Sequence, residues 1–201
     1  WILSLYFAEG IPYIIVMSFS VVMYKKLGIS NTDIALYTSW LYLPWIIKPL
    51  WSPFVDILKT THFWIVTMQF VIGAGLAAVA LTIPGPGFFR WSLLFFWLIA
   101  FSSATHDIAA DGFYMSSIDD SNQAWLVGIR STFYCLAMIT GQGLLVILAG
   151  KLEITMSSLP MAWALTMGLV AGMFLLLAMY NRFALPTPIQ IRVVKTSLLV
   201  T

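Results

Sequence analysis

The sequence predicts an all-α membrane protein with about six transmembrane helices. Its 201 residues are 61% hydrophobic and only 9% charged, and the mean hydropathy is +0.93. Soluble domains carry roughly 25% charged residues, so this chain has too little charge to cover its own surface in water. Apolar runs of about 20 residues, the length that crosses a bilayer, follow one another along the chain. The lipid bilayer is therefore its expected solvent.

The composition argues against several other classes of protein. The formal net charge is only +2 and no basic cluster is present, so we expect no nucleic acid partner. The single cysteine, Cys135, lies in an apolar run, which leaves no disulfide framework within the chain and no cysteine-based metal site. We predict neither a cofactor nor a bound metal. The nine Trp, eight Tyr and fourteen Phe suit a protein that meets two membrane interfaces.

Six apolar segments are separated by short polar or glycine- and proline-rich connections. Lys25 and Lys26 end the first segment, and Ser30 to Asp33 offer N-caps for the second. We predict helices over residues 1–24, 34–55, 63–83, 91–114, 125–149 and 159–180, which together form a bundle over 1–182. Residues 183–201 are expected to begin a cytoplasmic linker. The connections are too short to hold a soluble domain.

Two further features of the sequence concern the ends of the chain and its orientation in the membrane. Residue 1 is a Trp inside an apolar run, and the last residues stop without an obvious end, so we expect the chain to be part of a longer protein. The predicted connections place four basic residues on each side of the membrane. The positive-inside rule therefore does not decide which side is cytoplasmic.

Charged residues within the predicted helices are the strongest functional signal. There are five of them, Glu9, Lys48, Asp107, Asp111 and Arg130. A charge at the middle of a membrane helix costs roughly 2.5–3.5 kcal/mol, so we expect these side chains to face the bundle interior and to pair. With a rise of about 1.5 Å per residue, all five fall ~5–12 Å from the same face of the membrane. They are predicted to form one layer.

This layer holds three carboxylates and two cations, which leaves one carboxylate without a partner. A buried, unpaired carboxylate tends to hold a proton, and proton-coupled transport needs such a group. We therefore hypothesise that the five residues bind a solute or couple its transport to protons. Uptake that a protonophore abolishes would agree with this hypothesis, and uptake indifferent to the proton gradient would contradict it.

Alternatives stay open for the individual charges. Glu9 lies beside Gly10 and Pro12, where a helix tends to kink and free its backbone groups, which favours a place in the cavity. Lys48 contacts either the solute or Glu9. Asp111 and Arg130 either serve the solute or form ion pairs that lock a gate near the helix ends.

Four further residues are candidates for the site. Asp56, in the connection after the second helix, is predicted to take part in gating. Trp45, His106 and Gln142 are candidate solute contacts. Gln142 is flanked by glycines, and for His106 the alternative is an ordinary packing or hydrogen-bonding role.

Three motifs resemble those of one transporter family. The segment 7–12, FAEGIP, resembles the first-helix signature of AmpG-like permeases, a branch of the major facilitator superfamily beside the acetyl-coenzyme A transporters. The segment 43–56, LPWIIKPLWSPFVD, resembles the second helix, in which a Lys, a Trp-x-Pro and an Asp follow in that order. The segment 106–112, HDIAADG, is similar to the fourth-helix pattern, although His106 replaces the usual Gln. Glu9 stands where the family often has a small polar residue.

The resemblance implies the amino-terminal half of a twelve-helix fold, with the amino terminus inside a bacterial inner membrane. The carboxyl-terminal half of the same protein would be its partner. AmpG-like permeases import muropeptides, which are sugar-containing fragments of the cell wall, by proton symport. The resemblance thus implies a symporter of a small polar solute. After Asp56, Lys59 is the only cation where many facilitators have a basic cluster, which implies a weaker gate.

Two other classes of function remain as alternatives to a carrier. A membrane enzyme would use His106, Asp107 and Asp111, whose pattern is similar to part of the paired-aspartate motif of lipid head-group transferases. The spacing differs from that motif, and no second paired-aspartate motif follows, so we predict no enzyme activity. A receptor or scaffold that does not transport is the other alternative. Metal analysis with a chelator tests the first, and uptake into proteoliposomes tests the second.

Overall fold

The computed structural model describes residues 2–117 and 120–186, and within them the chain is almost entirely helical, with no strand. Five helices in this part are long and apolar enough to cross a membrane, namely Leu3–Lys26, Thr61–Thr82, Phe88–Met115, Gly128–Thr155 and Leu159–Ala184. The prediction of an all-helical, multi-pass membrane protein is confirmed to this extent. Most of the predicted linker, residues 187–201, lies outside the described residues.

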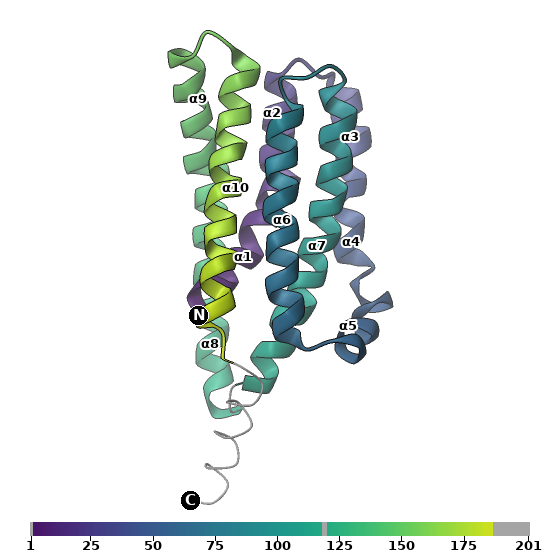
Figure 1. Cartoon of the computed structure of the whole chain (residues 1–201), viewed down its shortest axis with the longest axis vertical. Helices are drawn as coiled ribbons and strands as arrows, with labels where there is room; N and C mark the ends of the chain where they lie inside the picture. Colours follow the sequence, from purple (N-terminus) through teal and green to yellow (C-terminus); the bar gives the residue numbers. More distant parts are fainter. Residues whose placement is uncertain (1, 118–119, 187–201) are drawn as a thin grey trace, which may run out of the picture.

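The long helices run side by side along the length of the molecule (Figure 1). The first is continuous through α1 (Ile2–Ile14), the π-helix η1 (Ile15–Phe19) and α2 (Ser20–Lys26). Then follow α6 (Thr61–Thr82) and α7 (Phe88–Ser117). The next helix is formed by α8 (Asp120–Met138), the π-helix η4 (Ile139–Leu144) and α9 (Leu145–Thr155), and α10 (Leu159–Ala184) is the last. α6 packs against α7 and α10, while α1 packs against α8 and α7.

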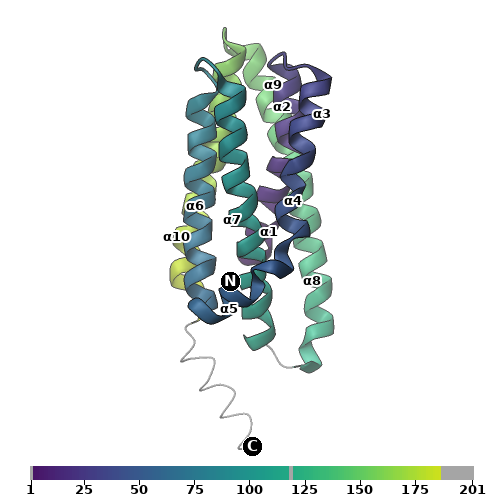
Figure 2. The same ribbon diagram turned by 90° about the vertical axis from the view of Figure 1, so that its right-hand side faces the viewer.

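The second predicted helix is broken into short pieces. They are α3 (Asn31–Ser39), η2 (Trp40–Tyr42), α4 (Leu43–Ile46), η3 (Lys48–Leu50) and α5 (Ser52–Leu58). Pro49 and Pro53 cause the breaks, because proline lacks the N–H that continues a helix and clashes with the preceding turn. α3 and α4 still follow the bundle, whereas α5 lies near the end at which α6 begins (Figures 1 and 2). A sixth span over 34–55 therefore stays a prediction.

The α9 and α10 helices continue past their predicted ends, and polar contacts stabilise their last turns. The α9 helix continues to Thr155, and there Glu153 accepts hydrogen bonds from Lys26 Nζ at 3.0 Å and from Trp163 Nε1 at 2.7 Å. The α10 helix continues past 180 to Ala184. Its Asn181 is fully buried and bonds to Gln69 at 3.2 Å. The polar residues expected to form connections at 150–158 and after 180 thus join helices instead.

The first long helix and the helix formed by α8, η4 and α9 approach each other closely at two glycines. A Cβ atom at Gly10 would lie 2.6 Å from Ala137 Cβ, and one at Gly141 would overlap the side chain of Ile14. α1 itself continues through Gly10 and Pro12, and the irregular turns follow in η1. Both helices contain a π-helix next to this contact, and η1 packs against η4. The close packing of these two helices positions Glu9 opposite α8.

We expect Gly141→Ala to destabilise the protein by about 1–3 kcal/mol, the usual cost of overpacking. Gly143→Ala is the matched control, because nothing lies within 4 Å of a Cβ at Gly143 in the same π-helix. Thermal unfolding of the purified full-length protein in detergent measures both effects. If Gly141→Ala melts no lower than Gly143→Ala, the two helices are not in close contact at this point.

Candidate functional site

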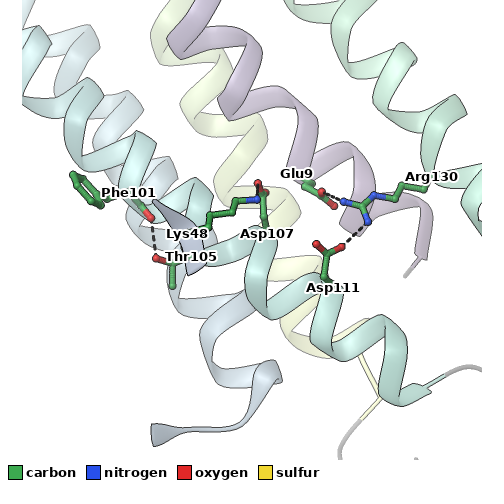
Figure 3. A network of polar contacts seen from close by, with 7 residues as sticks. All are labelled: Glu9, Lys48, Phe101, Thr105, Asp107, Asp111 and Arg130. Atoms are coloured by element: carbon green, nitrogen blue, oxygen red, sulfur yellow. Dashed lines mark hydrogen bonds and ion pairs between the residues drawn. The ribbon is translucent and has the colours of Figure 1, made fainter. Parts of the chain in front are cut away.

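The five charged residues predicted to form a layer come together at one level of the bundle. Arg130 of α8 donates to Glu9 Oε1 of α1 at 2.6 Å and to Asp111 Oδ1 of α7 at 2.6 Å. Lys48 of η3 donates to Asp107 Oδ2 of α7 at 2.7 Å. Figure 3 shows the two groups of ion pairs side by side, joined through one face of α7. We call these residues, Glu9, Lys48, Asp107, Asp111 and Arg130, the charge cluster.

The pairing within the charge cluster differs from the expectation. No carboxylate is left without a cation, because the guanidinium of Arg130 presents two N–H edges and binds Glu9 and Asp111 together. Lys48 pairs with Asp107 and not with Glu9. The cluster still holds three carboxylates and two cations, so its net charge is −1 when all are ionised. The excess negative charge lies at the two carboxylates that share Arg130.

The charge cluster has a buried side and an open side. Glu9 and Asp107 are only 7% and 6% exposed. The side chains of Asp111 and Arg130 are 41% and 39% exposed, and that of Lys48 is 27% exposed. Glu9 Oε2 and Asp107 Oδ1 are buried and have no hydrogen-bond partner among the described residues. Because an unpaired buried acceptor is costly, these two oxygens are poised to receive a donor.

A partly open cavity of about 200 Å³ lies beside Glu9 and Asp107, the two buried members of the cluster. Its lining consists of two carboxylates and four aromatic rings: Glu9, Tyr13, Tyr42, Trp45, Asp107 and Tyr134. The rings of Tyr13 and Trp45 meet edge to face, with centroids 5.2 Å apart, and Tyr42 stacks against Trp45 at 6.5 Å. Such walls combine hydrogen-bond acceptors with flat apolar faces, which suits a small polar solute.

A larger groove of about 650 Å³ lies on the open side, between the broken second segment and α7. Its lining residues are Lys48, Pro49, Ser52, Pro53, Ile108, Asp111, Gly112 and Met115. Each group of ion pairs therefore contributes one carboxylate or cation to the cavity and another to the groove. Asp107 faces the cavity and Lys48 the groove, while Glu9 faces the cavity and Asp111 the groove. The two spaces have no lining residue in common.

Two predicted solute contacts do not line the cavity. His106 is fully buried, and its Nε2 lies 2.9 Å from Gln69 Nε2. Asn181 donates to Gln69 Oε1, and Ser4 donates to Asn181, so Gln69 must donate to His106. This arrangement fits the hydrogen-bonding alternative that we kept open for His106.

Gln142 is exposed on η4 and donates to Ser18 Oγ at 3.2 Å, away from the cavity. Trp45, in contrast, lines the cavity as expected. The side chain of Asp56 lies outside the described residues, so its predicted role in gating stays a prediction. Among the residues that the structure describes, no group of three His, Cys, Asp or Glu side chains is arranged to hold a metal ion.

Sequence reasoning missed the three tyrosines of the cavity, Tyr13, Tyr42 and Tyr134. A helical spacing rule could have found two of them. Tyr13 follows Glu9 by four residues and Tyr134 follows Arg130 by four, and residues four apart share a helix face. Tyr42 precedes Trp45 by three residues, but the break in the second segment hides its direction.

The apolar helices and the charge cluster define a multi-pass membrane protein with an aromatic, acidic cavity. The chain is 27% identical over 157 residues to the anhydromuropeptide permease of Escherichia coli strain K12. The alignment covers 75% of this chain and 31% of the permease. The anhydromuropeptide permease of strain O157:H7 gives the same identity and coverage. This chain is also 26% identical over 149 residues to an uncharacterised protein of Schizosaccharomyces pombe, and that alignment covers 67% of this chain and 28% of the other protein.

These similarities support a relationship to a family of transporters. The chain spans about a third of the length of the curated relatives that it matches. No family model matches the chain. No solved structure matches it either.

Proposed function

We propose that this chain is the amino-terminal half of a secondary active transporter of the major facilitator superfamily. It imports a small polar solute, a sugar or muropeptide-type fragment of the cell wall, by proton symport and alternating access. Its place is a bacterial inner membrane, with a carboxyl-terminal half of the same protein as its partner. The observation that carries the proposal is the charge cluster, with its excess carboxylate between a cavity and a groove.

Protonation at the charge cluster is the coupling step in this proposal. Glu9 and Asp111 share Arg130, so a proton on either carboxylate removes the excess charge and leaves the other in a one-to-one ion pair. Asp111 takes the coupling proton from the groove because it is the more exposed of the two, and Arg130 then pairs with Glu9 alone, which stays ionised next to the solute. Proton uptake and solute binding thus act on one electrostatic unit.

The ion pairs also serve as the gate between the cavity and the groove. Opening requires Lys48 to leave Asp107 and Arg130 to leave one carboxylate, and a proton or a bound solute compensates for the lost contact. Asp56 adds to the closed state from the end of the second helix. The sixth span, over 34–55, supplies Trp45, Tyr42 and Lys48, and its proline breaks let these side chains approach α7.

Uptake by the full-length protein in proteoliposomes tests this function. With a radiolabelled muropeptide that carries a free amino group as the probe, we expect an inward proton gradient to drive accumulation and a protonophore to abolish it. Asp111→Asn should remove accumulation but retain exchange at equilibrium, since the coupling carboxylate is lost while the cavity lining is unchanged. Glu153→Gln is the control, because Glu153 is bonded to Lys26 and Trp163 outside the cluster. Accumulation that ignores the proton gradient, or survives Asp111→Asn, contradicts the proposal.

A further inference from the structure

We propose that the cavity binds a primary ammonium group carried on one ring or a short chain of the solute, with Glu9 and Asp107 as its hydrogen-bond acceptors. This inference rests on the transporter role proposed above and specifies the chemical class of its solute. Three properties of the cavity support it, namely the sign of its charge, its unused hydrogen-bonding groups and its size.

The charged residues that line the cavity are both acidic. Glu9 and Asp107 face it, whereas their cations Arg130 and Lys48 do not belong to its lining. The charge cluster as a whole carries one more carboxylate than cations. A cavity walled in this way has a negative potential that favours a cation over a neutral or anionic group.

The unused hydrogen-bonding groups select among cations. Glu9 gives one oxygen to Arg130 and Asp107 gives one to Lys48, and the second oxygen of each is buried without a partner in the described part of the chain. A primary ammonium brings three N–H donors to such acceptors. A quaternary ammonium brings none and would leave both oxygens unpaired. The pattern therefore favours a primary amine.

The aromatic rings and the volume limit what carries the amine. Tyr13, Tyr42, Trp45 and Tyr134 surround the acceptors, and cations bind well within about 6 Å of such ring centroids. Trp45 Nε1 is a buried donor with no partner among the described residues, which suits a hydroxyl or carbonyl oxygen of the solute. The volume of about 200 Å³ is below the roughly 300–1,000 Å³ of drug-sized pockets, so the cavity holds a single ring or a short chain, and because it is partly open the rest of a larger solute can lie outside it.

Three sugars that differ at one substituent test this assignment: glucosamine, N-acetylglucosamine and glucose. Binding to the purified full-length protein is measured by calorimetry at a pH at which glucosamine is protonated. We expect glucosamine to bind at least about tenfold more tightly than the two neutral sugars, the effect of a charge-assisted hydrogen bond. Choline should bind more weakly than glucosamine. Equal or tighter binding of N-acetylglucosamine, or of choline, overturns the assignment.

Variants locate the effect in the cavity. Glu9→Gln should reduce glucosamine binding to the level of N-acetylglucosamine, while Glu153→Gln should leave the preference unchanged. If Glu9→Gln does not fold, Tyr42→Leu removes one ring of the cavity, and it should weaken glucosamine binding more than N-acetylglucosamine binding, because the ring face favours a cation. An unchanged preference in the folded variant overturns the assignment.

Uptake assays separate this inference from the proposed function. Proton-driven uptake of neutral sugars without any preference for the amine leaves the transporter role intact and refutes the ammonium site. Amine-selective binding without any uptake supports the ammonium site and refutes the transporter role.

Discussion

Arg130→Met is expected to cost roughly 3 kcal/mol of stability, the lower end of the range for breaking a buried ion pair. The variant leaves Glu9, which is 7% exposed, beside Asp111 with no cation between them. The lower end applies because the Arg130 side chain is itself 39% exposed and solvent screens part of the interaction. Thermal unfolding in detergent should show a lower melting temperature, and accumulation of solute should be lost.

A second substitution distinguishes lost charge balance from lost packing in this variant. Arg130→Met with Glu9→Gln removes the isolated carboxylate, so part of the stability should return while proton-driven accumulation stays absent. Arg130→Lys should be intermediate, since an ammonium is a point charge without the planar fork that binds two carboxylates. A single Arg130→Met variant as stable as the unmodified protein would show that the three residues are not in contact.

Lys48→Met should destabilise the protein more than Asp107→Asn does. Without Lys48, the carboxylate of Asp107 is 6% exposed with no cation, and an uncompensated buried charge costs several kcal/mol. Without the Asp107 charge, Lys48 can turn its ammonium into the groove that it lines, because long cationic side chains reach water readily. Thermal unfolding of the two variants measures the difference.

The double variant Lys48→Met with Asp107→Asn completes the cycle. We expect it to be more stable than Lys48→Met alone, with a coupling energy of about 0.5–3 kcal/mol, as found for residues in one ion-pair network. Additive effects of the two substitutions would mean that Lys48 and Asp107 act independently. Because Asp107 also lines the cavity, the double variant should bind the solute poorly even when its stability is restored.

Much of the charge cluster was predictable because a charged side chain in a membrane helix must avoid contact with lipid. Glu9, Lys48, Asp107, Asp111 and Arg130 could not face lipid, so the helix rise and the alternating helix direction placed them at one level. The pairing was not predictable in this way. Depth along a helix says nothing about its rotation or neighbours, and only the packed structure puts Lys48 against Asp107 and gives Arg130 two partners.

The sequence by itself determined the solvent, the helical class and the residues that must hide from lipid, because these follow from hydropathy and from the cost of burying charge. Only the tertiary structure decided the rest. The turns added to α9 and α10 and the ring-lined cavity depend on contacts between residues far apart in the chain. Such contacts produce no periodic pattern of residues in the sequence, since each depends on how separate helices pack together.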